Sequence, residues 1–197
     1  MENDLNSIEH EAEEVKQLIF QHFKIDKFDD LLPYFYSDFK KDFIASLAAK
    51  LSIMAKQNDV VREIFEETGY QIARHIMALV PKIDKRLFSM QDGLPIVCAG
   101  SVFKSWSLIK PGFVQCLNKQ IKKFPSLNEL NLVLADSDSS IGACLLASKL
   151  YDNKIDLIST YKRKSVVLDH FYVNKFQNFY QCETEIFSTD NLIPKEV

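Results

Sequence analysis

The chain has 197 residues, 47% hydrophobic and 26% charged, a composition typical of globular proteins that excludes extended disorder and collagen-like repetition. A formal net charge of -3 provides no overall positive field for binding nucleic acid or an anionic membrane. The acidic first 14 residues lack a secretory signal, and no apolar stretch approaches the ~20 residues that cross a bilayer. We therefore expect a cytoplasmic protein.

The first 80 residues are predicted to form helices, because their apolar residues recur with a period near 3.6. The expected helices carry the apolar faces of residues 15–23, 28–35, 44–55 and 61–80. Asn58 or Asp59 is expected to cap the fourth helix, and Pro81 to end it.

Beyond Pro81 the pattern changes to strand, turn and helix, repeated twice. The expected elements are a strand at 94–99, a helix at 101–118, a strand at 130–135 and a helix at 139–150. Pro111 is expected to kink the first of these helices or to restart it at Lys110, which affects the direction of Ser105. Residues from 154 onward are predicted to hold one or two strands and a frayed acidic terminus.

The turn that follows the first strand, CAGSVFKSW at 98–106, is the most informative segment of the chain. Gly100 has no side chain, and Ser101 offers a hydroxyl beside the unpaired amides of a helix start. Such a turn suits the ribose or phosphates of a nucleotide. The same residues also fit a plain strand-to-helix turn in which serine is the N-cap.

Three stretches, GLPIVCAGSVFKSW (93–106), GYQIARHIMALVPKID (69–84) and YSDFKKDFIASLAAKL (36–51), resemble the eukaryotic N-acetyl-D-glucosamine kinases. These are BadF-type ATPases of the actin-like sugar kinase superfamily. The resemblance implies an α/β fold. The chain would be the C-terminal, nucleotide-side part of an actin-like, ribonuclease H-like kinase fold, and this part would be rich in helices and contain two core strands. It implies a helical segment of the nucleotide lobe at 1–92, a strand-helix-strand-helix core at 93–153 and a divergent tail at 154–197.

The resemblance also implies a set of nucleotide contacts. Gly100, Ser101 and Ser105 match the family's turn against ATP or ADP, and Ala45 matches the opposite wall of the adenosine pocket. The helix at 139–150 matches a small-residue helix that packs back across the two lobes. In the complete family enzyme the ATP γ-phosphoryl group passes to the 6-hydroxyl of N-acetylglucosamine, with Mg²⁺ neutralising charge.

The catalytic parts of such a kinase have no counterpart here. The family uses glycine-rich phosphate loops and a carboxylate base, whereas this chain has 5 glycines and no two lie within three residues of each other. We therefore expect a truncated protein with no catalytic residue and no activity alone. The resemblance implies that further strands of the kinase sheet lie in the part of the family that this chain does not match. The sheet would then have an open apolar edge, so we expect marginal stability or pairing with another chain. That partner would be a second copy, giving a homodimer, or a full-length kinase.

Two other functions remain open at this point. A non-catalytic helical interaction module would need no phosphate loop. Alternatively, LVLADSDS at 132–139 resembles the first motif of haloacid-dehalogenase-type phosphatases, with Asp136 as nucleophile and Asp138 as acid and base. Only about 60 residues follow, too few for the rest of such a core, so these aspartates fit a turn and an N-cap better.

The four cysteines, Cys98, Cys116, Cys144 and Cys182, form no C-x-x-C pair and no cluster with histidine. Three of them lie in apolar runs. We expect reduced, mostly buried thiols and no metal site built from them.

Overall fold

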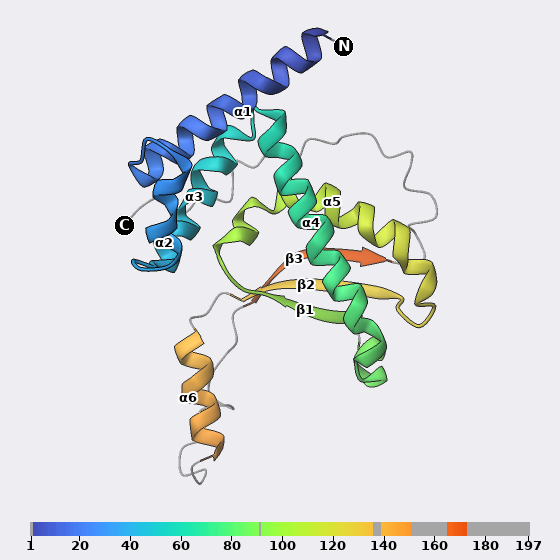
Figure 1. The fold of residues 1–197 in the computed structure, drawn as a ribbon. Coiled ribbons are helices and arrows are strands. Elements are labelled where there is room, and N and C mark those ends of the chain that lie inside the picture. The colour runs from blue at the N-terminus through green and yellow to red at the C-terminus, as the bar shows by residue number, and fades with distance from the viewer. Residues whose placement is uncertain (1, 91, 136–138, 151–164, 173–197) are drawn as a thin grey trace.

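The structure, a computed structural model, describes residues 2–90, 92–135, 139–150 and 165–172 (Figure 1). This part of the chain is a helix-rich, mixed α/β fold with one small sheet. The helices are α1 (Glu2–Phe23), α2 (Leu32–Phe35), α3 (Lys41–Met54), α4 (Asp59–Leu79), α5 (Trp106–Gln120) and α6 (Ser139–Leu150). The strands are β1 (Leu94–Cys98), β2 (Glu129–Ala135) and β3 (Ser165–Tyr172).

The start of α4 is fixed by its own cap and by α1. The side chain of Asn58 accepts a hydrogen bond from the backbone N–H of Val61, which confirms Asn58 as the N-cap. The Asn58 amide also donates to the backbone oxygen of Glu11, and the Glu11 carboxylate accepts from the N–H groups of Asp59 and Val60. A carboxylate at a helix N-terminus also interacts favourably with the helix dipole, so α1 and α4 are joined by polar contacts.

The sheet has the order β1-β2-β3. β1 pairs with β2 in parallel, with Leu94 opposite Leu130, and β2 pairs with β3 antiparallel, with Leu130 opposite Phe171. The two predicted strands are confirmed to within one residue at each end, and β3 falls in the segment where one or two strands were predicted. No described strand lies on the other side of β1, so β1 is an edge of the sheet in this part of the chain.

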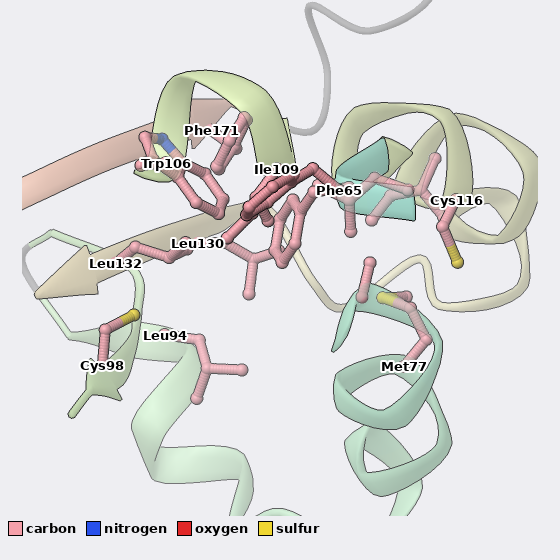
Figure 2. Packing of buried hydrophobic residues seen from close by; sticks show 14 of the residues in the cluster. Phe65, Met77, Leu94, Cys98, Trp106, Ile109, Cys116, Leu130, Leu132 and Phe171 are labelled. Carbon is pink, nitrogen blue, oxygen red and sulfur yellow. The ribbon is translucent and has the colours of Figure 1, made fainter. Parts of the chain in front are cut away.

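The core lies between this sheet and the helices α4 and α5 (Figure 2). Leu94 and Cys98 of β1, Leu130 and Leu132 of β2, and Phe171 of β3 turn their side chains toward the two helices. The helices contribute buried side chains that include Phe65, Met77, Trp106, Ile109 and Cys116. A single core therefore contains residues from both sides of the predicted division at 92/93.

Two glycines allow α4 and α5 to approach closely. A Cβ atom at Gly69 would lie 1.9 Å from the backbone oxygen of Ile109, and one at Gly112 would lie 1.7 Å from that of Glu66. No side chain fits at such distances, so the crossing of the two helices depends on both glycines.

The helix predicted at 101–118 differs from the structure in two ways. Ser101–Ser105 is a short 3-10 helix (η4), and the α-helix α5 begins only at Trp106. The restart expected at Lys110 is wrong, because α5 is continuous through Pro111. Pro111 has no N–H to donate to the Ser107 carbonyl, and because both residues are exposed, water can supply the missing hydrogen bond at little cost.

α6 stands apart from the sheet and the other helices in Figure 1. Its placement along the chain matches the predicted helix at 139–150. A Cβ atom at Gly142 would have no atom within 4 Å, and Leu146 and Leu150 are exposed. Two large apolar side chains of α6, Leu146 and Leu150, are therefore uncovered, whereas Ile141 and Leu145 are half-buried. Within those residues no helix is long and apolar enough to cross a membrane.

The cysteines differ in accessibility. Cys98 and Cys116 are buried as expected, whereas Cys144 on α6 is exposed, and Cys182 lies outside the described residues. Burial raises the pKa of the Cys98 thiol to about 11 and also raises the pKa of Cys116. Because the thiolate is the reactive species, both buried cysteines should react slowly with thiol reagents.

We expect Cys98 to react with a disulfide reagent at pH 8 at least about 100-fold more slowly than the exposed Cys144, because burial restricts access to Cys98 and raises its pKa. Peptide mass spectrometry after timed labelling measures the two rates separately. In denaturant the two rates should become similar. Equal rates in the native protein would contradict the burial of Cys98.

Candidate functional site

The turn between β1 and α5 is built around Gly100. Its φ of 109° lies in the region that side chains rarely adopt, and a Cβ atom placed there would meet no atom within 4 Å. The backbone is thus open on this side, and Ser101 beside it is exposed. A ligand could reach the main chain at Gly100 without moving any described residue.

Neither Ser101 nor Ser105 caps a helix with its side chain. Gly100, not Ser101, occupies the N-cap position of η4, and no side-chain cap bond is present there or at Ser105, the N-cap of α5. The plain reading of Ser101 as an N-cap is therefore wrong, because the segment begins with a 3-10 turn whose bond runs from Phe103 N–H to the Gly100 oxygen. The Ser101 hydroxyl remains available to a ligand.

Ala45 lies on α3, which contacts η4 although residues 55–100 separate the two elements in sequence. The side of α3 that carries Ala45 is exposed. The structure thus places α3 and η4 in contact. Of the predicted adenosine contacts, Ala45 lies on α3, Ser101 and Ser105 lie on η4, and Gly100 directly precedes η4. In the described part of the chain no hydrogen bond joins Ala45 to Gly100, Ser101 or Ser105.

The start of α5 is anchored by residues that the sequence did not single out. The Trp106 indole N–H donates to Asp169 of β3 at 2.7 Å, and the Lys110 ammonium lies 2.8 Å from the same oxygen of Asp169. Trp106 directly follows Ser105, so this network fixes the end of the candidate turn against the sheet. No signal in the sequence could reveal it, because Asp169 is 63 residues away from Trp106.

A separate apolar groove of about 930 Å³ runs between α4 and the edge strand β1. Its walls include Ile64, Ile72 and Ile76 of α4, and Ile96 and Val97 of β1. Phe103 of η4 closes it near the candidate turn, but Gly100, Ser101 and Ala45 do not line it. The groove is therefore distinct from the predicted nucleotide site.

Acidic groups for a metal are not gathered near the turn. In the described ranges no three side chains of His, Cys, Asp or Glu lie close enough to hold a metal ion. These residues do not fit the Mg²⁺ site that the resemblance implies, and we derive no step through that ion. Asp136 and Asp138, the predicted phosphatase pair, lie outside the described residues.

Comparison of the sequence with the models of known protein families finds no match. The geometry of the turn, of α3 and of the groove therefore carries the functional interpretation.

Proposed function

We propose that this chain is the adenosine-binding side of a sugar-kinase-like protein similar to the N-acetylglucosamine kinases, with the actin-like kinase fold that this similarity implies. The observation that supports it most directly is the open backbone at Gly100, next to an unpaired serine hydroxyl and at the start of a 3-10 turn that contacts α3, the helix that carries Ala45. Adenosine would lie over Gly100 between η4 and α3. Ser101 and Ser105 would bind the ribose, and Ala45 would leave room for the base.

Among the described residues we find no loop that would bind the phosphates strongly. Its 5 glycines include no phosphate-binding cluster, and the described residues offer no acidic group set for Mg²⁺. We therefore expect only the adenosine part of a nucleotide to contribute to binding. Adenosine, ADP and ATP should then bind with dissociation constants near the millimolar range and within about threefold of one another. We also expect no phosphorylation of N-acetylglucosamine by this chain.

Binding is tested by titrating isotope-labelled protein with adenosine and with Mg-ADP and following backbone amide resonances. The expected result is a saturable change confined to residues near Gly100, Ser105 and α3. Ala45→Phe should abolish it by filling the space for the base. Ala78→Phe is the matched control, because Ala78 is also an exposed helical alanine but lies on α4, outside the site.

Three outcomes would overturn the proposal: no resonance change at millimolar nucleotide, changes located elsewhere, or equal binding by the Ala45→Phe variant. A coupled assay with ATP and N-acetylglucosamine tests turnover separately. Robust turnover would show that catalytic groups exist in this chain and that their absence was wrongly inferred.

A second candidate, a non-catalytic interaction module, is favoured by a different observation. The apolar residues of α6, the groove and the exposed edge strand present binding surface that no described residue covers. This candidate does not exclude nucleotide binding at the turn, because Ala45, Gly100, Ser101 and Ser105 do not line the groove.

A further inference from the structure

A second pocket lies at the C-terminal end of α1. It has a volume of about 640 Å³ and is formed by the last turns of α1 and by the chain that follows the helix at residues 24–28. None of the four residues of the proposed adenosine site lines this pocket. It is therefore a separate place at which a ligand could bind.

The pocket is positively charged, although the whole chain carries a net charge of -3. Three lysines line it, Lys16, Lys24 and Lys27, against one acidic residue, Asp26. The Lys16 ammonium is already paired with Glu13 at 3.0 Å. Lys24 and Lys27 are exposed, and neither forms an ion pair with a residue in the described ranges. Two ammonium groups are thus free to bind an anion.

Lys24 has a backbone conformation that disfavours a side chain. Its φ is 56°, and no other described residue except glycine has a positive φ. The Ile25 N–H donates to the Phe20 oxygen at 3.1 Å, which closes the Schellman motif at the end of α1 with Lys24 in the position that glycine usually takes. The side chain of this strained residue lines the pocket, and strain of this kind is concentrated at ligand sites.

Two phenylalanine rings form the apolar part of the pocket. Phe20 and Phe28 lie edge to face, with ring centroids 5.1 Å apart and an interplanar angle of 74°. Phe28 is 51% exposed, so part of its ring is open to a further aromatic group. Gln21 also lines the pocket, and its amide forms no hydrogen bond within the described part of the chain. The pocket therefore combines an aromatic wall with free cationic and amide donors.

We propose that this pocket binds an aromatic phosphate monoester. The ring of the ligand lies against Phe20 and Phe28, and its phosphate lies between the ammonium groups of Lys24 and Lys27. A phosphate monoester carries close to two negative charges at neutral pH, and each free ammonium can pair with one of them. The negative end of the α1 dipole opposes an anion on the helix axis, so the phosphate lies beside the helix. This inference is independent of nucleotide binding at Gly100.

The proposal is tested by titrating isotope-labelled 197-residue protein with 2-naphthyl phosphate and following backbone amide resonances. We expect a saturable change confined to residues 16–28, with a dissociation constant of about 0.1–1 mM. 2-Naphthol and inorganic phosphate each supply only one of the two contacts and should bind at least about tenfold more weakly. 2-Naphthoate, with a single negative charge, should fall between them and the phosphate ester.

Two lysine variants test the anion contacts. Lys24→Asn and Lys27→Gln should each weaken binding of 2-naphthyl phosphate about fivefold or more, and should leave binding of 2-naphthol unchanged. Asparagine is chosen at position 24 because it adopts a positive φ more readily than other side chains. Circular dichroism checks that both variants remain folded.

Lys56→Asn is the matched control. Lys56 is also an exposed lysine that follows the end of a helix, α3, but it does not line the pocket. This variant should bind 2-naphthyl phosphate as the wild type does. The absence of a saturable change at residues 16–28 would overturn the proposal. Equal binding of 2-naphthol, or equal weakening by Lys56→Asn, would overturn it as well.

Discussion

Gly112→Ala is expected to destabilise the protein by at least about 3 kcal/mol, and to prevent folding if the total stability is small. The added Cβ would lie 1.7 Å from the backbone oxygen of Glu66 and 2.5 Å from its carbonyl carbon. Both atoms belong to the backbone of α4, so no side-chain rotation relieves the overlap. The helices would have to separate and expose part of the core between them.

Urea unfolding followed by circular dichroism measures this effect. Gly142→Ala is the matched control, because Gly142 also lies inside a helix but its added Cβ meets nothing within 4 Å. Alanine there should be neutral or stabilise α6 by up to about 1 kcal/mol through its helix propensity. A Gly112→Ala variant as stable as the wild type would show that α4 and α5 do not cross as closely as described.

Asp169→Leu is expected to cost about 2–3 kcal/mol, since it removes both polar contacts of the anchor and leaves a buried indole N–H without an acceptor. The carboxylate oxygen of Asp169 accepts from Trp106, whose side chain is 8% exposed, and pairs with Lys110. Without this anchor β3 would lose a polar link to α5. The turn at Ser105 would become less ordered as a result.

Two further variants separate the contributions of this network. Asp169→Asn retains an oxygen that can accept from Trp106 and should cost only about 1 kcal/mol. Lys110→Met should cost less than about 1 kcal/mol, because the half-exposed ammonium gains little from a screened ion pair. Thermal or urea unfolding of the three variants gives this order. A reversed order, with Lys110→Met the most costly, would contradict the role given to the Trp106 bond.

The helices were predictable because their determinants are local. The period of apolar residues located α1, α3 and α4, and Asn58 supplied a capping signal that the structure confirms. The short segment at residues 28–35 is helical too, divided between a 3-10 turn at Phe28–Leu31 and α2. The strands β1 and β2 were also predicted, because their continuous apolar runs are bounded by turn residues.

The details of the candidate site were less predictable. The sequence indicated Gly100 as a position for close approach, and its positive φ agrees with that expectation. It did not indicate that a 3-10 turn would place Gly100, rather than Ser101, at the N-cap. Of its two expectations for Pro111, the restart of the helix at Lys110 is wrong, because α5 runs through Pro111 without a break.

The sequence by itself determined the helical first half, the strand-turn-helix pattern and the glycine at the candidate turn, since each depends on residues a few positions apart. Only the tertiary structure decided that α3 lies against η4, that Asp169 holds Trp106, and that α4 and β1 border an apolar groove. These contacts join residues that are tens of positions apart, and no local pattern encodes such distances. They arise from the packing of the two helices on the sheet, where Gly69 and Gly112 permit an approach that larger residues would prevent.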